Sequence, residues 1–184
     1  MQDPETDLAI NCTAQLSILE TCRHHNPSIR TVFASTRQIY GTPQYLPVDE
    51  KHPLRPADVN GINKLAGEQY HLLYNHVHGL RSSVLRLTNT IGPRMRIKDA
   101  RQTFLGIWLR RLLEGEVFEV WGGTQLRDLT DVEDCVQALL QSALCEDTYG
   151  RAFNLGGFET ISLQALAELL TDIHGQGTFN LCPF

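Results

Sequence analysis

Apolar residues recur along much of the chain at three- and four-residue spacings, which place them on one face of a helix. Glycine closes two of these patterns, at Gly79 and Gly115, where its freedom to adopt a left-handed backbone suits a helix end. Ser162 has a side chain able to cap the first turn of the last pattern. We therefore expect helices at residues 5–25, 57–80, 100–115, 128–144 and 161–175.

Short apolar runs bounded by polar or turn residues separate these helices, and we expect them to be strands. The segment 41–56 contains four prolines and is expected to be a loop. Helices and strands therefore alternate along the chain, which favours an α/β fold with a mostly parallel sheet. The expected strands are residues 30–35, 81–90, 117–123 and 151–157.

The composition is that of a soluble globular protein, with 42% hydrophobic and 20% charged residues in a chain of 184. The net charge of −5 gives no electrostatic reason to bind nucleic acid or an anionic membrane. No apolar run approaches the roughly 20 residues of a membrane span, and the acidic N-terminus has no hydrophobic signal core. We expect a cytoplasmic protein without nucleic-acid or membrane partners.

Neither the five cysteines nor the histidines show the spacing of a metal site. No CxxC pair occurs, which favours buried or partly buried thiols. His71, His76 and His78 lie close in sequence, but the first two are five residues apart and would face different ways on a helix. No carboxylate completes a set of ligands there, so we expect no metal site.

Five short motifs occur in one order and together cover nearly the whole chain. They are TVFASTRQIYG, VNGINKLAGEQY, LRLTNTIGPR, EVWGGTQLRDLTDVEDCVQALL and FNLGGFETISLQALAELL. In this order they resemble the extended short-chain dehydrogenase/reductases, the NAD-dependent nucleotide-sugar epimerases and dehydratases. The resemblance implies a partial Rossmann-type parallel sheet with part of a small C-terminal substrate domain. Residues 1–90 would belong to the NAD-binding domain, and 91–184 would combine part of the substrate domain with a returning Rossmann strand and helix.

The Gly-rich turn that opens a dinucleotide-binding fold has no counterpart in this sequence. The chain starts on a helical pattern instead of a strand. We therefore expect it to lack the first part of the family fold. It should bind NAD poorly, because the pyrophosphate would lose its helix N-terminus and backbone donors.

The catalytic roles of the family fall by resemblance on Thr36, Asn60 and Lys64. The family uses a tyrosine as acid/base, and a lysine four residues later lowers the tyrosine pKa and holds the nicotinamide ribose. Here Lys64 matches, but the tyrosine position holds Asn60. A carboxamide cannot take over the proton transfer, whose loss typically costs roughly 10²–10⁴ in rate. Asn60 is a helix residue without chemistry, a sugar contact in a variant site, or a mark of lost catalysis.

The resemblance also implies residues that bind the cofactor and the nucleotide diphosphate-sugar. An asparagine of the first helix, Asn11, would support the site without touching substrate. That helix, residues 7–24, resembles the helix through which family members dimerise, so a homodimer is expected. The cofactor residues would be Lys64, Ser35 and Leu87, and the substrate residues Arg37, Asn89, Thr103, Phe104 and Arg127.

Two functions remain open from the sequence. The first is an NAD-dependent epimerase or dehydratase that transfers a hydride at a sugar carbon. The alternative is a catalytically inactive chain that binds a nucleotide-sugar or associates with itself.

Overall fold

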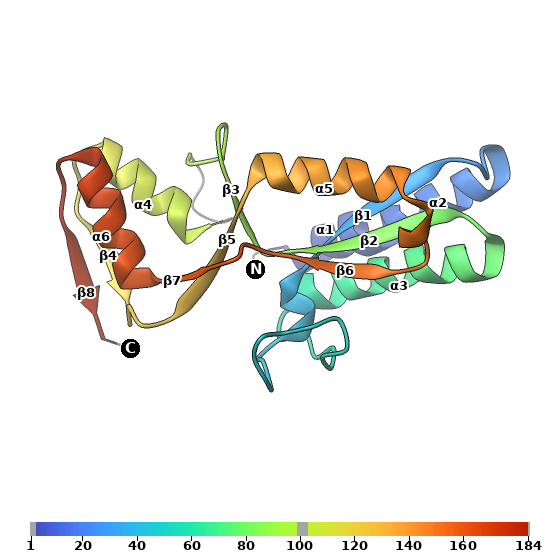
Figure 1. Ribbon diagram of the computed structural model, residues 1–184, viewed down its shortest axis with the longest axis horizontal. Coiled ribbons are helices and arrows are strands. Elements are labelled where there is room, and N and C mark those ends of the chain that lie inside the picture. The colour runs from blue at the N-terminus through green and yellow to red at the C-terminus, as the bar shows by residue number, and fades with distance from the viewer. Residues whose placement is uncertain (1–2, 99–102, 184) are drawn as a thin grey trace. The chain divides into compact units, whose positions relative to one another are not determined.

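The computed structural model describes residues 3–98 and 103–183 (Figure 1). The chain divides into two compact units. The first unit comprises Met1–Thr88 and Glu133–Leu155, and the second comprises Asn89–Val132 and Gly156–Phe184. The chain therefore passes from one unit to the other three times, and neither unit is a single continuous segment.

A three-stranded parallel sheet forms the centre of the first unit. Its strand order is β1 (Arg30–Thr36), β2 (Arg81–Leu87) and β6 (Ala152–Leu155). Along β1 and β2 the register pairs Thr36 with Leu87, so the carboxyl ends of both strands lie at the same edge. Alternating helices and parallel strands confirm the predicted α/β class. Ligands of open α/β sheets bind outside this edge.

The predicted first helix is divided into three parts. The segment begins as α1 (Pro4–Leu8), continues as a π-helical turn η1 (Ala9–Thr13) and ends as α2 (Ala14–His25). Such a π turn is rare and is often found at functional sites. This one contains Asn11, the residue expected to support the site.

The longest helix of the first unit is α3 (Val59–His78), and both of its ends are capped. At its start the Asp58 side chain accepts a hydrogen bond from the Gly61 amide, and at its end Gly79 has a left-handed backbone with φ 68°. The predicted stop at Gly79 is confirmed. Helix α3 packs against β1, β2 and α2, where Leu19, Tyr74 and Leu80 form a small buried cluster.

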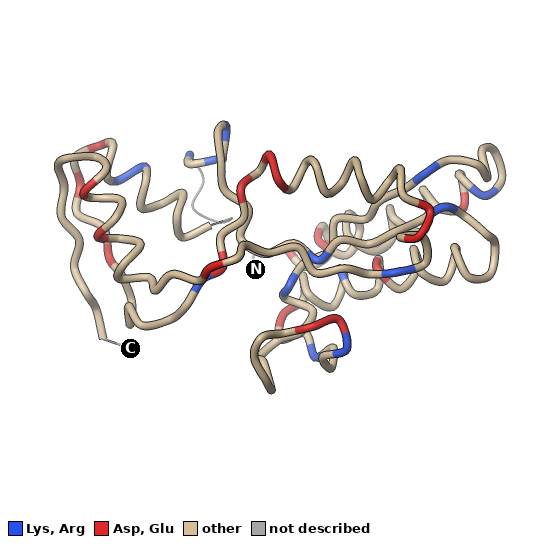
Figure 2. The backbone as a smooth tube through the Cα atoms, viewed as in Figure 1, with Lys and Arg blue, Asp and Glu red and all other residues tan. Residues whose placement is uncertain are grey.

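The remaining helix of the first unit is α5 (Val132–Leu144). Two acidic residues, Glu133 and Asp134, occupy its first turn, and the tube is red at this end of the helix in Figure 2. Negative charge there is favourable because the helix dipole is positive at this end. The sequence predicted this helix, but from residue 128.

The second unit has its core between two helices and a pair of parallel strands. The strands are β4 (Phe118–Trp121) and β8 (Phe179–Cys182), and the helices are α4 (Phe104–Leu113) and α6 (Leu163–His174). The shared core includes Trp108, Leu112, Phe118, Val120, Leu166 and Ala167. The predicted cap of α6 is confirmed, since the Ser162 hydroxyl accepts from the Ala165 amide at 3.1 Å.

A second small sheet of this unit corrects one sequence prediction. Its strand order is β3 (Asn89–Ile91), β5 (Leu126–Asp131) and β7 (Thr160–Ser162), with β5 parallel to β3 and antiparallel to β7. The prediction that a helix begins at residue 128 was wrong, because residues 128–131 pair with two strands that are distant in sequence. Such pairing overrides local propensity.

Within the described parts of the chain, residues 3–98 and 103–183, no helix is both long enough and apolar enough to cross a membrane.

Candidate functional site

The end of strand β1 is joined to the start of helix α3 by a series of polar contacts. The Thr36 hydroxyl accepts from the Gln38 amide at 3.3 Å and so starts the 3-10 turn η2 (Arg37–Tyr40). The Gln38 side chain in turn donates to Asp58, the cap of α3, at 3.1 Å. Thr36 is thus fixed at the carboxyl edge of the sheet, while Arg37 after it is exposed.

Lys64 reaches the same strand from the first turns of α3. Its Nζ donates to the Ala34 carbonyl at 2.8 Å and lies 5.0 Å from the centroid of the Phe33 ring. Burial lowers the pKa of Lys64, and the negative charge of Asp7 counteracts this. The structure therefore brings the Lys64 ammonium group to β1, at a position two residues before Thr36.

Asn60 is directed toward helix α1. Its Nδ2 donates to Asp7 Oδ2 at 2.8 Å, and Nδ2 of Asn63 donates to Asp7 Oδ1 at 2.8 Å. The amide at the family's tyrosine position is therefore engaged with a neighbouring helix. Sequence reasoning missed Asp7, because no motif contains it and a single acidic residue near a helix start is common.

A buried ion pair lies one helical turn beyond Lys64. Glu68 has no exposed surface and accepts hydrogen bonds from Arg86 of β2 and from the Ser35 hydroxyl, the latter at 2.8 Å. Ser35 is only 3% exposed, so its side chain is committed to the interior. A cofactor contact of Ser35 stays a prediction, and only the main chain of this residue is available for it. Leu87, the third predicted cofactor residue after Lys64 and Ser35, ends β2 beside Thr36.

Tyr40 extends this buried network instead of facing an open site. Its hydroxyl accepts from Arg86 Nη1 at 2.6 Å and donates to Asn154 Oδ1 at 2.6 Å. Burial raises the pKa of Tyr40, and Arg86 counteracts this. Tyr40 is therefore a packing residue and is 4% exposed.

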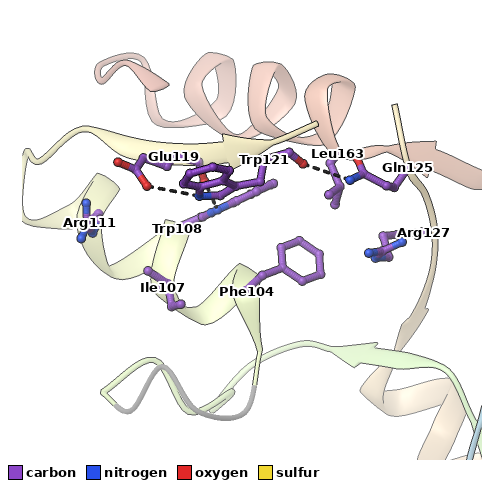
Figure 3. Close-up of a pocket in the computed structure, with 9 residues that line it drawn as sticks. All are labelled: Phe104, Ile107, Trp108, Arg111, Glu119, Trp121, Gln125, Arg127 and Leu163. Carbon is purple, nitrogen blue, oxygen red and sulfur yellow. Dashed lines mark hydrogen bonds between the residues drawn. The ribbon is translucent and has the colours of Figure 1, made fainter. Parts of the chain in front are cut away.

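The second unit contains a cavity of about 420 Å³ between α4 and β4 (Figure 3). Arg127 and Phe104, both predicted substrate residues, point toward each other across it, and the guanidinium carbon lies 5.9 Å from the ring centroid. The lining residues are Phe104, Ile107, Trp108, Arg111, Glu119, Trp121, Gln125, Arg127 and Leu163. An apolar wall with a few polar groups is typical of a small-molecule site.

The other two predicted substrate residues of this unit, Thr103 and Asn89, are connected to the elements that line the cavity. Thr103 caps α4, since its hydroxyl accepts from the Gly106 amide at 3.1 Å. Asn89 donates to the Asp128 carbonyl at 2.9 Å, next to Arg127 in β5. Both side chains therefore stabilise the elements that carry Phe104 and Arg127.

The sequence did not predict that the strand residues Glu119 and Trp121 line this cavity. In β4, Phe118 and Val120 are fully buried, whereas Glu119 and Trp121 are exposed. This alternation along the strand was the sequence signal that could have placed Glu119 and Trp121 on the other face. Trp121 is 54% exposed, and its Nε1 donates to the Glu119 carboxylate at 3.2 Å.

The similarity to solved structures extends over nearly the whole chain. A UDP-glucose 4-epimerase from Thermotoga maritima, solved with UDP-glucose, is 27% identical with a TM-score of 0.88. The match covers 98% of this chain and 59% of that one. A UDP-glucuronic acid 4-epimerase from Bacillus cereus, solved with NAD, is 25% identical with a TM-score of 0.87, over 100% of this chain and 59% of that one.

Curated relatives show the same similarity in sequence. A protein of Methanocaldococcus jannaschii assigned as a UDP-glucose 4-epimerase is 35% identical over 92% of this chain and 55% of its own length. The chain thus spans about half the length of the curated relatives it matches. The sequence pattern of the NAD dependent epimerase/dehydratase family matches residues 1–156. The chain therefore belongs to the NAD dependent epimerase/dehydratase family.

Proposed function

We propose that the chain belongs to an enzyme that acts on a nucleotide diphosphate-sugar by hydride transfer at a sugar carbon. The observation that carries this proposal is the cavity of the second unit, in which Arg127 faces the Phe104 ring. Two of its relatives are named as a UDP-glucose and a UDP-glucuronate 4-epimerase, which supports a substrate of this class.

The cavity suits the nucleotide part of such a substrate. Phe104 and the exposed indole of Trp121 offer aromatic surfaces on which a base can stack. The guanidinium of Arg127 is a planar fork that matches phosphate oxygens. Thr103 and Asn89 would act indirectly, by holding α4 and β5 in place.

The first unit suits part of an NAD site. Lys64 is fixed at the carboxyl edge of the sheet, where its ammonium group could hold ribose hydroxyls. Thr36 ends the adjacent strand and offers a hydroxyl to a substrate oxygen. NAD, when bound, would supply the hydride acceptor. Because the sequence contains no Gly-rich turn, we expect this chain to bind NAD weakly by itself.

Self-association through the first helical segment is the second part of the proposal. Helix α2 packs against α3, and exposed apolar side chains lie on both helices and on the turn η1 that precedes α2. These are Ile10, Ile18, Ile62, Leu73 and Val77. Apolar surface of this kind is a common feature of protein interfaces. A homodimer would cover it.

Calorimetric titration with UDP-glucose tests the nucleotide site on the chain itself. We expect Arg127→Ala to weaken binding by about tenfold or more, since a charge-assisted hydrogen bond contributes about 1.5–3 kcal/mol. Arg81→Ala is the matched control, because Arg81 is exposed in the first unit and does not line the cavity. The proposal is wrong if UDP-glucose does not bind, or if Arg127→Ala and Arg81→Ala bind it equally well.

A further inference from the structure

Asp7 is the common partner of three carboxamide side chains. Asn60 and Asn63 donate one hydrogen bond to each of its carboxylate oxygens, both at 2.8 Å. The side chain of Asn11 is a third polar neighbour of this carboxylate and helps to lower the pKa of Asp7. The three asparagines come from α3 and from η1, so Asp7 joins the start of the first helical segment to the start of α3.

The charge of Asp7 also acts on Lys64. Burial raises the pKa of Asp7, but the hydrogen bonds from Asn60 and Asn63, the side chain of Asn11 and the charge of Lys64 outweigh burial and hold that pKa below its usual value. Conversely, burial lowers the pKa of Lys64 and Asp7 counteracts this. The carboxylate is thus ionised at neutral pH and serves as a counter-charge for the lysine.

This arrangement opposes acid/base chemistry at position 60 in two ways. A phenol at this position would need an adjacent ammonium group to lower its pKa, and a nearby carboxylate has the reverse effect. The carboxylate also binds the side chain that occupies position 60 and turns it toward α1. Both effects have one origin, Asp7.

We propose that Asp7 is a positioning residue that fixes the side chain at position 60 against α1 and withholds the charge of Lys64 from it. The reaction under the proposed function, on which this inference rests, then lacks an acid/base group at position 60. Restoring such a group requires two substitutions, one at position 60 and one at Asp7.

Titration of an introduced phenol tests this inference on the chain as it exists. Asn60→Tyr alone should give a phenol whose pKa, followed by phenolate absorbance, is at or above the usual value of about 10. Adding Asp7→Asn should lower that pKa by about one unit or more, because Lys64 then acts on the phenol without an opposing charge. The absorbance of the matching chain with Asn60 is subtracted at each pH. This subtraction removes the contribution of the native tyrosines and leaves that of the introduced phenol.

Glu5→Gln is the matched control for the second substitution. Glu5 is an exposed carboxylate on the same short helix, and its removal should leave the phenol pKa of the Asn60→Tyr chain unchanged. The inference is overturned if Asn60→Tyr alone already lowers the phenol pKa, or if Asp7→Asn and Glu5→Gln have the same effect.

A double-mutant cycle provides a second measurement that needs no tyrosine. Asp7→Ala, Asn60→Ala and the combined variant are compared by urea unfolding. Each variant changes the unfolding equilibrium constant by some factor. We expect the factor for the combined variant to differ about tenfold from the product of the two single factors, as for a hydrogen bond to a charged group. If the factor for the combined variant equals the product of the two single factors, Asp7 does not position Asn60. Neither readout involves nucleotide binding, so failure of the proposed function would be seen separately, in the UDP-glucose titration.

Discussion

His71 of α3 illustrates how single residues of the first unit are held in one protonation state. The side chain is 3% exposed and stacks on Phe33 with the ring centroids 4.8 Å apart. Its Nδ1 lies 2.7 Å from the Ser82 hydroxyl, and its Nε2 lies 3.4 Å from the Gln15 amide oxygen. Burial lowers the pKa of His71 to about 4. The imidazole is therefore neutral in the folded protein at neutral pH.

This burial predicts a pH dependence of stability. Below its ordinary pKa of 6.5, the unfolded chain binds a proton at His71 that the folded protein does not bind. The free energy of unfolding should therefore fall between pH 6.5 and pH 4, by about 3 kcal/mol in total. Urea unfolding at several pH values checks this. His71→Gln should remove most of the slope, whereas His76→Gln, an exposed site on the same helix, should retain it. Equal slopes for both variants would contradict the prediction.

At the scale of elements, helix α3 lies close against its neighbours at Gly67. A Cβ atom at this position would lie 2.6 Å from the Asn11 carbonyl oxygen and 2.9 Å from the Phe33 ring. Glycine inside a helix costs about 1 kcal/mol relative to alanine. Close packing of α3 on η1 and β1 accounts for a glycine at this helix position.

We accordingly expect Gly67→Ala to destabilise the protein despite the higher helix propensity of alanine. Overpacking against backbone typically costs about 1–3 kcal/mol. Gln69→Ala, at an exposed site of α3, should leave the free energy of unfolding nearly unchanged or raise it slightly. The measurement is urea unfolding of both variants beside the parent chain. A more stable Gly67→Ala chain would show that α3 can move away from η1.

The elements that could be predicted from sequence are those decided by neighbours in the chain. The stop at Gly79 and the cap at Ser162 depend on one residue and its helix. Strand β5 could not be found in this way, because its pairing with β3 and β7 is non-local. The contact of Asp7 could not be predicted for the same reason, because its partner Asn60 is 53 positions away. The resemblance to the family predicted roles for Lys64, Phe104 and Arg127, but the directions of their side chains came only from the structure.

At the scale of the whole molecule, the exposed apolar side chains are the feature that indicates an interface with a partner. Ile18 of α2 is 49% exposed and Ile62 of α3 is 54% exposed, although α2 and α3 pack against each other. Leu144 of α5 is equally apolar and 66% exposed. It lies on a helix outside the surface proposed for the homodimer.

A charge introduced at the proposed interface should separate the subunits. We expect the parent chain to sediment as a dimer at micromolar concentration and Ile18→Glu or Ile62→Glu to weaken association by about tenfold or more. Leu144→Glu should leave the dimer intact. Sedimentation across a range of concentrations distinguishes these outcomes. A monomeric parent chain, or equal disruption by Leu144→Glu, would rule out an interface at α2 and α3.

The pairing of β6 with β2 has a consequence for how the protein is made. Val84 pairs with Ala152, which lies 68 positions further along the chain. Translation at about 5–20 residues per second therefore leaves one side of β2 without its partner for several seconds on the ribosome. An unpaired strand edge can be captured by another nascent chain. The yield of correctly assembled protein should thus depend on translation speed and on chaperones near the exit tunnel, which shield that edge until β6 arrives.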